Sequence, residues 1–193
     1  MSRKTVVYTL VALFISSAGS LLQAAEGWIT DYEAAKKQAA KEGKDILMDF
    51  TGSDWCGWCI RLKKEVFSQE AFKKQAPKHF VLLELDFPRA KKLEAKLKAQ
   101  NEKLRGEFAI EGYPTIMLTD AGGKPYAKTG YQPGGPEKYI THLAEKRAAK
   151  TVRDESFAAA EKAKDDTEKA KLLDKALSMI EKTGGIPVLS VYG

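Results

Sequence analysis

Two cysteines, Cys56 and Cys59, are the residues of this chain whose type and spacing are best suited to chemistry. Two residues separate them, and a tryptophan directly precedes each one. A Cys-x-x-Cys pair can form a redox-active dithiol, supply half of a metal site, attach a haem or form a structural disulfide. Trp55 and Trp58 offer flat apolar surface beside the sulfurs, which suits the binding of a substrate.

The rest of the composition disfavours the metal and haem interpretations. A closed zinc site needs four ligands, and the only two histidines, His79 and His142, are far apart in the sequence. Haem attachment requires a histidine directly after the second cysteine, where this chain has Ile60. A purely structural disulfide would close a very short loop and add little stability, although it stays open as an alternative. We therefore expect a redox dithiol, with no metal ion and no cofactor.

The residues around the pair predict a strand, a loop and a helix. The apolar run over residues 45–50 is typical of a short buried strand, and a helix is expected over residues 57–66. Cys56 would then face solvent at the start of the helix, where unpaired N–H groups and the helix dipole favour a thiolate. Cys59 would lie about one turn further in, close enough to attack a mixed disulfide on Cys56.

The pattern along the rest of the chain predicts an α/β fold. Strand–helix–strand order implies parallel strands with helices on both faces of the sheet, and a hairpin adds an antiparallel edge. From residue 150 the composition shifts to Ala, Lys, Glu and Asp, so we expect a helical C-terminal extension over 150–193 after a domain over 26–149. The expected helices cover residues 28–44, 69–75, 90–108 and 137–147, and the remaining strands cover residues 79–86, 115–119 and 125–129.

Capping and breaking residues set the expected helix ends. Thr30 or Asp31 can cap the first helix, and Gly43 can end it. Ser68 is expected to cap the helix over residues 69–75, and Pro77 is expected to stop it.

The N-terminal residues 1–25 have the pattern of an export signal. Arg3 and Lys4 precede a short apolar run, which small residues close before Glu26. The apolar run is shorter than the roughly 20 residues that span a bilayer as a helix. We therefore expect a signal peptide over residues 1–25 and a periplasmic or secreted mature protein, with an uncleaved anchor as the alternative.

The charge balance is mildly basic. The chain has 32 Lys and Arg against 26 Asp and Glu, a net charge of +6, to which residues 1–25 contribute Arg3 and Lys4. The lysines are spread among glutamates in helical stretches, and the sequence shows no basic cluster interleaved with aromatic residues. We therefore do not expect nucleic acid as a partner.

The chain resembles the thioredoxin superfamily, and more closely the exported bacterial thioredoxin-like thiol–disulfide oxidoreductases. The resemblance covers residues 28–147 and implies a thioredoxin fold, a central mixed sheet flanked by helices. It rests on the sequence DFTGSDWCGWC over residues 49–59, the sequence GYPT over residues 112–115, Asp86 at a strand end, and the turn over residues 120–124 followed by Gly130.

The resemblance implies roles for named residues. Cys56 would be the attacking thiol and Cys59 the resolving thiol. Pro114 would have a cis peptide bond, with Tyr113 presenting its backbone to an extended substrate strand. Asp49 matches the buried acid behind the resolving cysteine, which helps to move a proton and should have a raised pKa.

Two departures from the family pattern bear on these roles. The loop between Asp49 and Cys56 is one residue longer than in thioredoxin, which makes Asp54 a rival for the acid, although Asp54 better suits a loop-capping role. Trp58 stands where the oxidases and isomerases of the family have a histidine. The residues between the cysteines therefore do not settle the direction of electron flow.

The resulting expectation is a thiol–disulfide oxidoreductase that acts on protein substrates outside the cytoplasm, in the reducing direction rather than the oxidising one. Such a protein needs a membrane or periplasmic electron-transfer partner. The alternatives are a peptide-binding or chaperone-like module in which the thiols are secondary, and an assembly protein that contacts a partner through the residues after 150.

Overall fold

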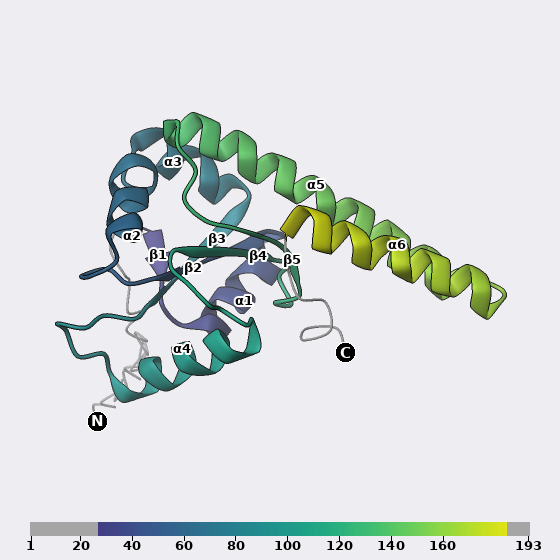
Figure 1. Cartoon of the computed structure of the whole chain (residues 1–193), viewed down its shortest axis with the longest axis horizontal. Helices are drawn as coiled ribbons and strands as arrows, with labels where there is room; N and C mark the ends of the chain where they lie inside the picture. Colours follow the sequence, from purple (N-terminus) through teal and green to yellow (C-terminus); the bar gives the residue numbers. More distant parts are fainter. Residues whose placement is uncertain (1–26, 185–193) are drawn as a thin grey trace, which may run out of the picture.

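The structure, a computed structural model, describes residues 27–184. The expected export signal over residues 1–25 lies outside this range. Within the range, a five-stranded mixed sheet with the order β1-β3-β2-β4-β5 carries helices on both faces, as the sequence predicted (Figure 1). None of the helices in residues 27–184 combines the length and the hydropathy of a membrane-spanning segment.

The sheet contains a parallel half and an antiparallel half. The central strand β2 (Asp45–Thr51) pairs in parallel with β3 (Phe80–Asp86) on one side and antiparallel with β4 (Thr115–Thr119) on the other. The edge strand β5 (Pro125–Thr129) forms the expected hairpin with β4. The bounds of these four strands agree with the sequence prediction to within one residue.

The first expected helix is wrong at its N-terminus. Residues Trp28–Ile29 form a short strand, β1, which pairs in parallel with β3, and helix α1 covers only Tyr32–Glu42. The boundary lies where Asp31 accepts a hydrogen bond from the backbone N–H of Ala34 (2.9 Å). Gly43 ends α1 in the left-handed conformation, as expected.

The region after the cysteines also departs from the prediction. Helix α2 (Gly57–Leu62) continues into a π-helical turn, Lys63–Phe67, in which the N–H of Ser68 donates to the carbonyl of Lys63 (2.8 Å). Ser68 is therefore not the cap of helix α3 (Glu70–Gln75), whose N-cap Gln69 makes no side-chain hydrogen bond. Helix α3 ends at Gln75, as predicted, and Pro77 lies near the start of a following 3₁₀ turn, Ala76–Lys78, where a missing N–H costs nothing.

Two further helices differ in length from the expectation. Helix α4 covers Ala95–Glu107, so residues 90–94 belong to a loop over residues 87–94 instead of forming its first turn. Helix α5 covers Gly135–Lys162 and runs without a break across residue 150, and helix α6 (Asp166–Gly184) returns along it (Figure 1). The helical character expected after residue 150 is confirmed as far as Gly184, and residues 185–193 lie outside the described range.

Two apolar layers enclose the sheet. Alternate residues of the buried strands point to opposite faces, so Leu47 and Leu82 face one layer while Met48 and Leu83 face the other. The first layer packs against α2, α3 and α5, and the second against α1 and α4; the helical residues that contribute are Leu62, Phe72, Tyr139 and Leu143 in the first, and Ala35, Ala39 and Leu104 in the second.

Candidate active site

The cysteines lie at the turn from strand β2 to helix α2. The backbone N–H of Cys56 donates to the carbonyl of Gly52 (2.9 Å), which folds the loop back on itself. Cys56 is the N-cap residue of α2, and its Sγ accepts from the N–H of Cys59 at 3.2 Å. The expected position of the first sulfur at a helix N-terminus is therefore confirmed.

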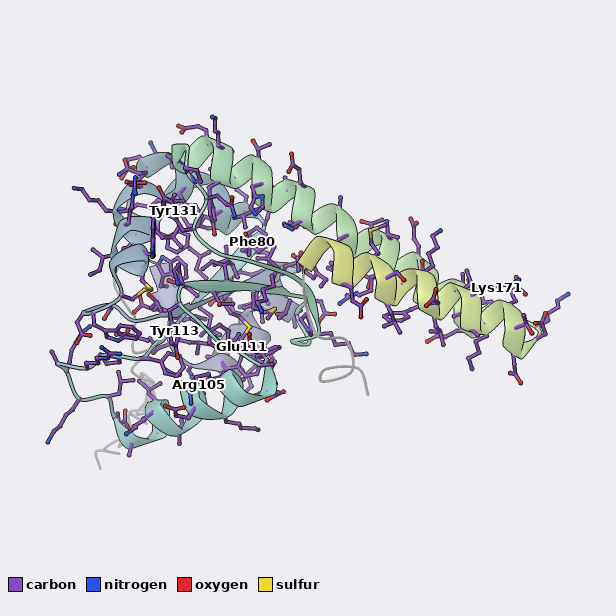
Figure 2. All side chains as sticks on the ribbon, in the orientation of Figure 1. Phe80, Arg105, Glu111, Tyr113, Tyr131 and Lys171 are labelled. Atoms are coloured by element: carbon purple, nitrogen blue, oxygen red, sulfur yellow. A yellow bond between two sulfur atoms is a disulfide. The ribbon has the colours of Figure 1, made fainter. Side chains whose placement is uncertain are left out.

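Cys56 and Cys59 form a disulfide, with an S–S distance of 2.10 Å. Cys56 is 7% exposed and Cys59 is 4% exposed. The prediction that Cys56 faces solvent is wrong for this oxidised state, because both cysteines are buried. The disulfide is drawn in yellow at the start of α2 in Figure 2.

Trp55 is held in place by groups on both sides of its indole. Its Nε1 donates to the carbonyl of Phe87 (2.7 Å), in the loop after β3. A Cβ atom at Gly52 would lie 2.5 Å from the indole, so only glycine leaves room for the ring. The ring also meets Tyr113 edge-on, with centroids 5.7 Å apart.

The peptide bond between Tyr113 and Pro114 is cis, as the resemblance implied. The ring of Tyr113 contacts both Trp55 and Phe87, which places this loop next to the residue that precedes Cys56. Figure 2 shows Tyr113 beside Arg105 of α4, toward the same end of the molecule as the disulfide.

Trp58 and Ile60 form the exposed apolar surface of α2, with 56% and 47% of their area accessible. The ring of Trp58 lies 5.2 Å from that of Tyr131, and the guanidinium of Arg61 covers both rings. Trp55 is thus half-buried while Trp58 is open to solvent, although the sequence assigned both the same role.

Asp49 lies on β2 behind the cysteines, on the face that packs against α2 and α5. Asp49, Cys59, Lys63 and Glu84 line one cavity of about 470 Å³. Burial raises the pKa of Asp49 well above its usual value, and the nearby carboxylate of Glu84 raises it further. Although the loop between Asp49 and Cys56 is one residue longer than in thioredoxin, Asp49 and Cys59 line the same cavity.

The Oδ1 atom of Asp49 has no hydrogen-bond partner among the residues that the structure describes. A buried carboxyl group without a partner is costly to ionise. Burial thus favours the protonated form of this carboxyl group, and the adjacent cavity lets a reactant or water reach it to exchange the proton.

Asp54, the rival acid, has a different role. Its carboxylate accepts hydrogen bonds from the backbone N–H groups of Arg89 (3.0 Å) and Ala90 (2.7 Å). These hydrogen bonds lower its pKa, so it remains an acceptor and not a proton donor. The loop-capping interpretation of Asp54 is confirmed.

Sequence reasoning missed Glu84 and Gly52. Glu84 pairs in register with Asp49 on the neighbouring strand and forms an ion pair with Lys63 (3.7 Å). Its signal was a single charged residue inside the otherwise apolar run over residues 80–85. Residues 27–184 contain no group of three or more His, Cys, Asp or Glu side chains that could hold a metal ion.

Residues 32–146 match the thioredoxin-like domain family, so the chain belongs to this family. With the disulfide at the helix start and the cis-proline loop beside it, the protein is a protein thiol–disulfide oxidoreductase.

Two curated relatives and one solved structure are similar to it. The chain is 33% identical to the disulfide bond reductase DsbH of Chlamydia pneumoniae over 112 residues, which are 58% of this chain and 68% of the relative. It is 30% identical over 92 residues to the thiol:disulfide interchange protein DsbD of Actinobacillus pleuropneumoniae, covering 48% of this chain and 14% of that relative. A solved DsbH oxidoreductase matches with a TM-score of 0.60 at 28% identity, over 75% of this chain and 94% of the other.

Proposed function

We propose that this protein reduces disulfides of protein substrates outside the cytoplasm. The observation that carries the proposal is that the Cys56–Cys59 disulfide caps α2 while Cys59 shares a cavity with the buried acid Asp49, whose pKa burial raises. Cys56 acts as the nucleophile, Cys59 resolves, and Asp49 moves the proton.

The reaction starts from the reduced dithiol. The Cys56 thiolate attacks a substrate disulfide, forms a mixed disulfide and releases one substrate thiolate. The released substrate thiolate takes the proton of the Asp49 carboxyl. The Asp49 carboxylate then takes the proton of the Cys59 thiol, and the resulting thiolate attacks Sγ of Cys56. The second substrate sulfur leaves as a thiolate and is protonated by water, and the protein is left with the Cys56–Cys59 disulfide that the structure contains. Trp55, Trp58, Tyr113 and Pro114 provide the surface on which the substrate chain lies.

Several features support the reducing direction and the location. The similar protein from Chlamydia pneumoniae is named a disulfide bond reductase. The motif has no histidine to stabilise the Cys56 thiolate, which disfavours a strongly oxidising pair. The export pattern over residues 1–25 indicates a compartment where a membrane or periplasmic electron-transfer partner must re-reduce the disulfide.

The test is the reduction potential of the Cys56–Cys59 couple, measured by equilibration of the purified protein with glutathione redox buffers. We expect a value near that of thioredoxin, about −270 mV. A value at or above about −180 mV would contradict the reducing direction and indicate an oxidase or isomerase. Cys56→Ser is the control, because it removes the couple.

A second candidate is a peptide-binding module in which the thiols are secondary. It is favoured by the exposure of Trp58 and Ile60, two large apolar side chains on one surface. In that case Cys56→Ser would retain binding of unfolded chains and their protection from aggregation, whereas the proposed reductase loses its activity entirely.

A further inference from the structure

A groove lies beside the candidate active site, between the loop over residues 87–94 and helix α4. It has a volume of about 760 Å³. Trp55 and Tyr113 form its end nearest the disulfide, and Phe87, Pro88 and Leu93 add apolar lining. A substrate chain at Cys56 would therefore extend naturally into this groove.

The rim of the groove is strongly basic. Five cationic side chains line it, from Arg89, Lys91, Lys92, Lys98 and Arg105, against the two acids Asp86 and Glu102. The sequence shows no basic cluster interleaved with aromatic residues, but folding brings the cations of this loop and helix to the aromatic rings of Trp55 and Tyr113.

Both acids in the groove are already engaged within the protein. Asp86 accepts hydrogen bonds from the N–H (2.9 Å) and hydroxyl (2.6 Å) of Ser53, and Lys91 lies 3.4 Å away. Glu102 pairs with Arg105 at 3.0 Å. Two of the five cations are thus neutralised locally.

The other three cations, Arg89, Lys92 and Lys98, are exposed and form no ion pair with any residue in the described part of the chain. Arg89 lies over the indole of Trp55, 3.9 Å from the ring centroid. The loop that carries it is anchored, because Asp54 accepts its backbone N–H groups and Trp55 donates to Phe87. The positive charge is therefore held in place beside the site.

We propose that this groove binds an acidic segment of the substrate protein that flanks the disulfide to be reduced. The proposal rests on the proposed function and adds a substrate preference to it. The three unpaired cations meet carboxylates of the segment, while the aromatic lining receives its apolar atoms. Complementary charge of this kind acts mainly on recognition and on the association rate.

The first test compares the reduction of two peptides with the same disulfide, one flanked by glutamates and the other by glutamines. We expect the wild-type protein to have a kcat/KM about tenfold higher for the acidic peptide at low salt. In Lys92→Gln/Lys98→Gln this preference falls about fivefold. High salt lowers the preference of the wild type in the same way.

The matched control is Lys169→Gln/Lys171→Gln, which removes the same charge from exposed positions on α6. Lys171 lies on the helical hairpin far from Tyr113 in Figure 2. The control retains the wild-type preference. An equal loss in both double variants, or no preference in the wild type, would overturn the proposal, since the groove would then have no specific effect.

A second measurement separates this inference from the proposed function. Isothermal titration calorimetry with an acidic peptide that contains no cysteine reports binding without thiol exchange. If neither disulfide peptide is reduced but the acidic peptide binds and the Lys92/Lys98 variant weakens it, the proposed function fails and the groove assignment stands. If reduction proceeds without such binding or preference, the groove assignment fails alone.

The same groove charge could attract other polyanions. Vesicles that contain anionic lipid and a single-stranded oligonucleotide are therefore titrated as competitors. Weak, salt-sensitive binding of these two competitors, equal in the wild type and in Lys169→Gln/Lys171→Gln, supports the proposal. Tighter binding of either competitor than of the acidic peptide, lost in Lys92→Gln/Lys98→Gln, would overturn it.

Discussion

Asp49 in the candidate site has a pKa well above its ordinary value. Its side chain is buried in the layer between the sheet and helices α2 and α5. In that layer, burial and then the charge of Asp49 raise the pKa of Tyr139. Glu84 lies opposite on the neighbouring strand, so a second carboxylate opposes the ionisation of Asp49. The ionised form of such a buried group lowers the stability of the folded protein.

Asp49→Asn should stabilise the oxidised protein above neutral pH. Because the folded-state pKa is raised, the stability that protonated Asp49 contributes is fully present below its ordinary pKa of about 3.9. That stability is lost as the pH rises through the raised value. We expect the variant to gain about 2 kcal/mol in the free energy of unfolding at pH 8 and little at pH 4, measured by urea titration.

The same variant should slow disulfide reduction by about 100-fold, because no group then takes the Cys59 proton. Glu84→Gln is the comparison, since it leaves Asp49 in place and lowers its pKa, moving the pH profile of the reaction to lower pH. Unchanged stability and unchanged rate in Asp49→Asn would show that Asp49 has no part in the reaction.

At the level of elements, the site depends on how two loops meet. The loop after β2 presents Asp54 and Trp55, and the loop after β3 supplies their partners at Phe87, Arg89 and Ala90. These hydrogen bonds explain why the lysine-rich segment begins its helix at Ala95: the preceding residues are held in a loop by contacts with another part of the chain.

Gly52→Ala should disrupt the contact between the loop after β2 and the loop after β3. The added Cβ would lie 2.5 Å from the indole of Trp55 and displace the ring from its hydrogen bond to Phe87. We expect a loss of about 1–3 kcal/mol in the free energy of unfolding and an altered tryptophan fluorescence spectrum. Gly57→Ala is the matched control, because a Cβ there meets nothing within 4 Å. Equal stability of the two variants would contradict the packing argument.

At the level of the whole molecule, the long helix α5 is fastened to the sheet by buried charges. Asp45 is buried at the start of β2, where it pairs with Arg147 (3.0 Å) and Lys150 (2.6 Å) of α5. Further along, Arg153 pairs with Asp120 (2.9 Å) and donates to the carbonyls of Lys124 and Pro125. The division of the chain at residue 150 remains a prediction, and these contacts tie residues beyond it to the domain.

Arg153→Ala should destabilise the protein without changing the candidate site. The guanidinium is 3% exposed, so its removal leaves buried acceptors and Asp120 without their partner. We expect the free energy of unfolding to fall by about 3 kcal/mol, measured by urea denaturation, with the activity of the folded protein retained. Lys171→Ala, an exposed change on α6, should change it by less than about 0.5 kcal/mol. A similar small effect in Arg153→Ala would mean that α5 is held by apolar packing alone.

The sequence by itself determined the features that depend on neighbouring residues. Cys56 and Cys59 could be assigned to a helix start, Gly43 to a helix end, and residues 120–124 to a hairpin turn, because capping, helix dipoles and turns act within a few positions. Family motifs extended this to the cis bond before Pro114 and to the buried position of Asp49.

Only the tertiary structure decided what distant residues do to one another. Trp28 joins the sheet because β3 offers it a partner strand, and α5 continues past residue 147 because Asp45 and Asp120 bind its cations. Glu84 raises the Asp49 pKa, and the basic groove forms beside Trp55, through contacts between segments more than 30 positions apart. Burial and charge pairing across such separations follow from packing, which no local pattern of residues encodes.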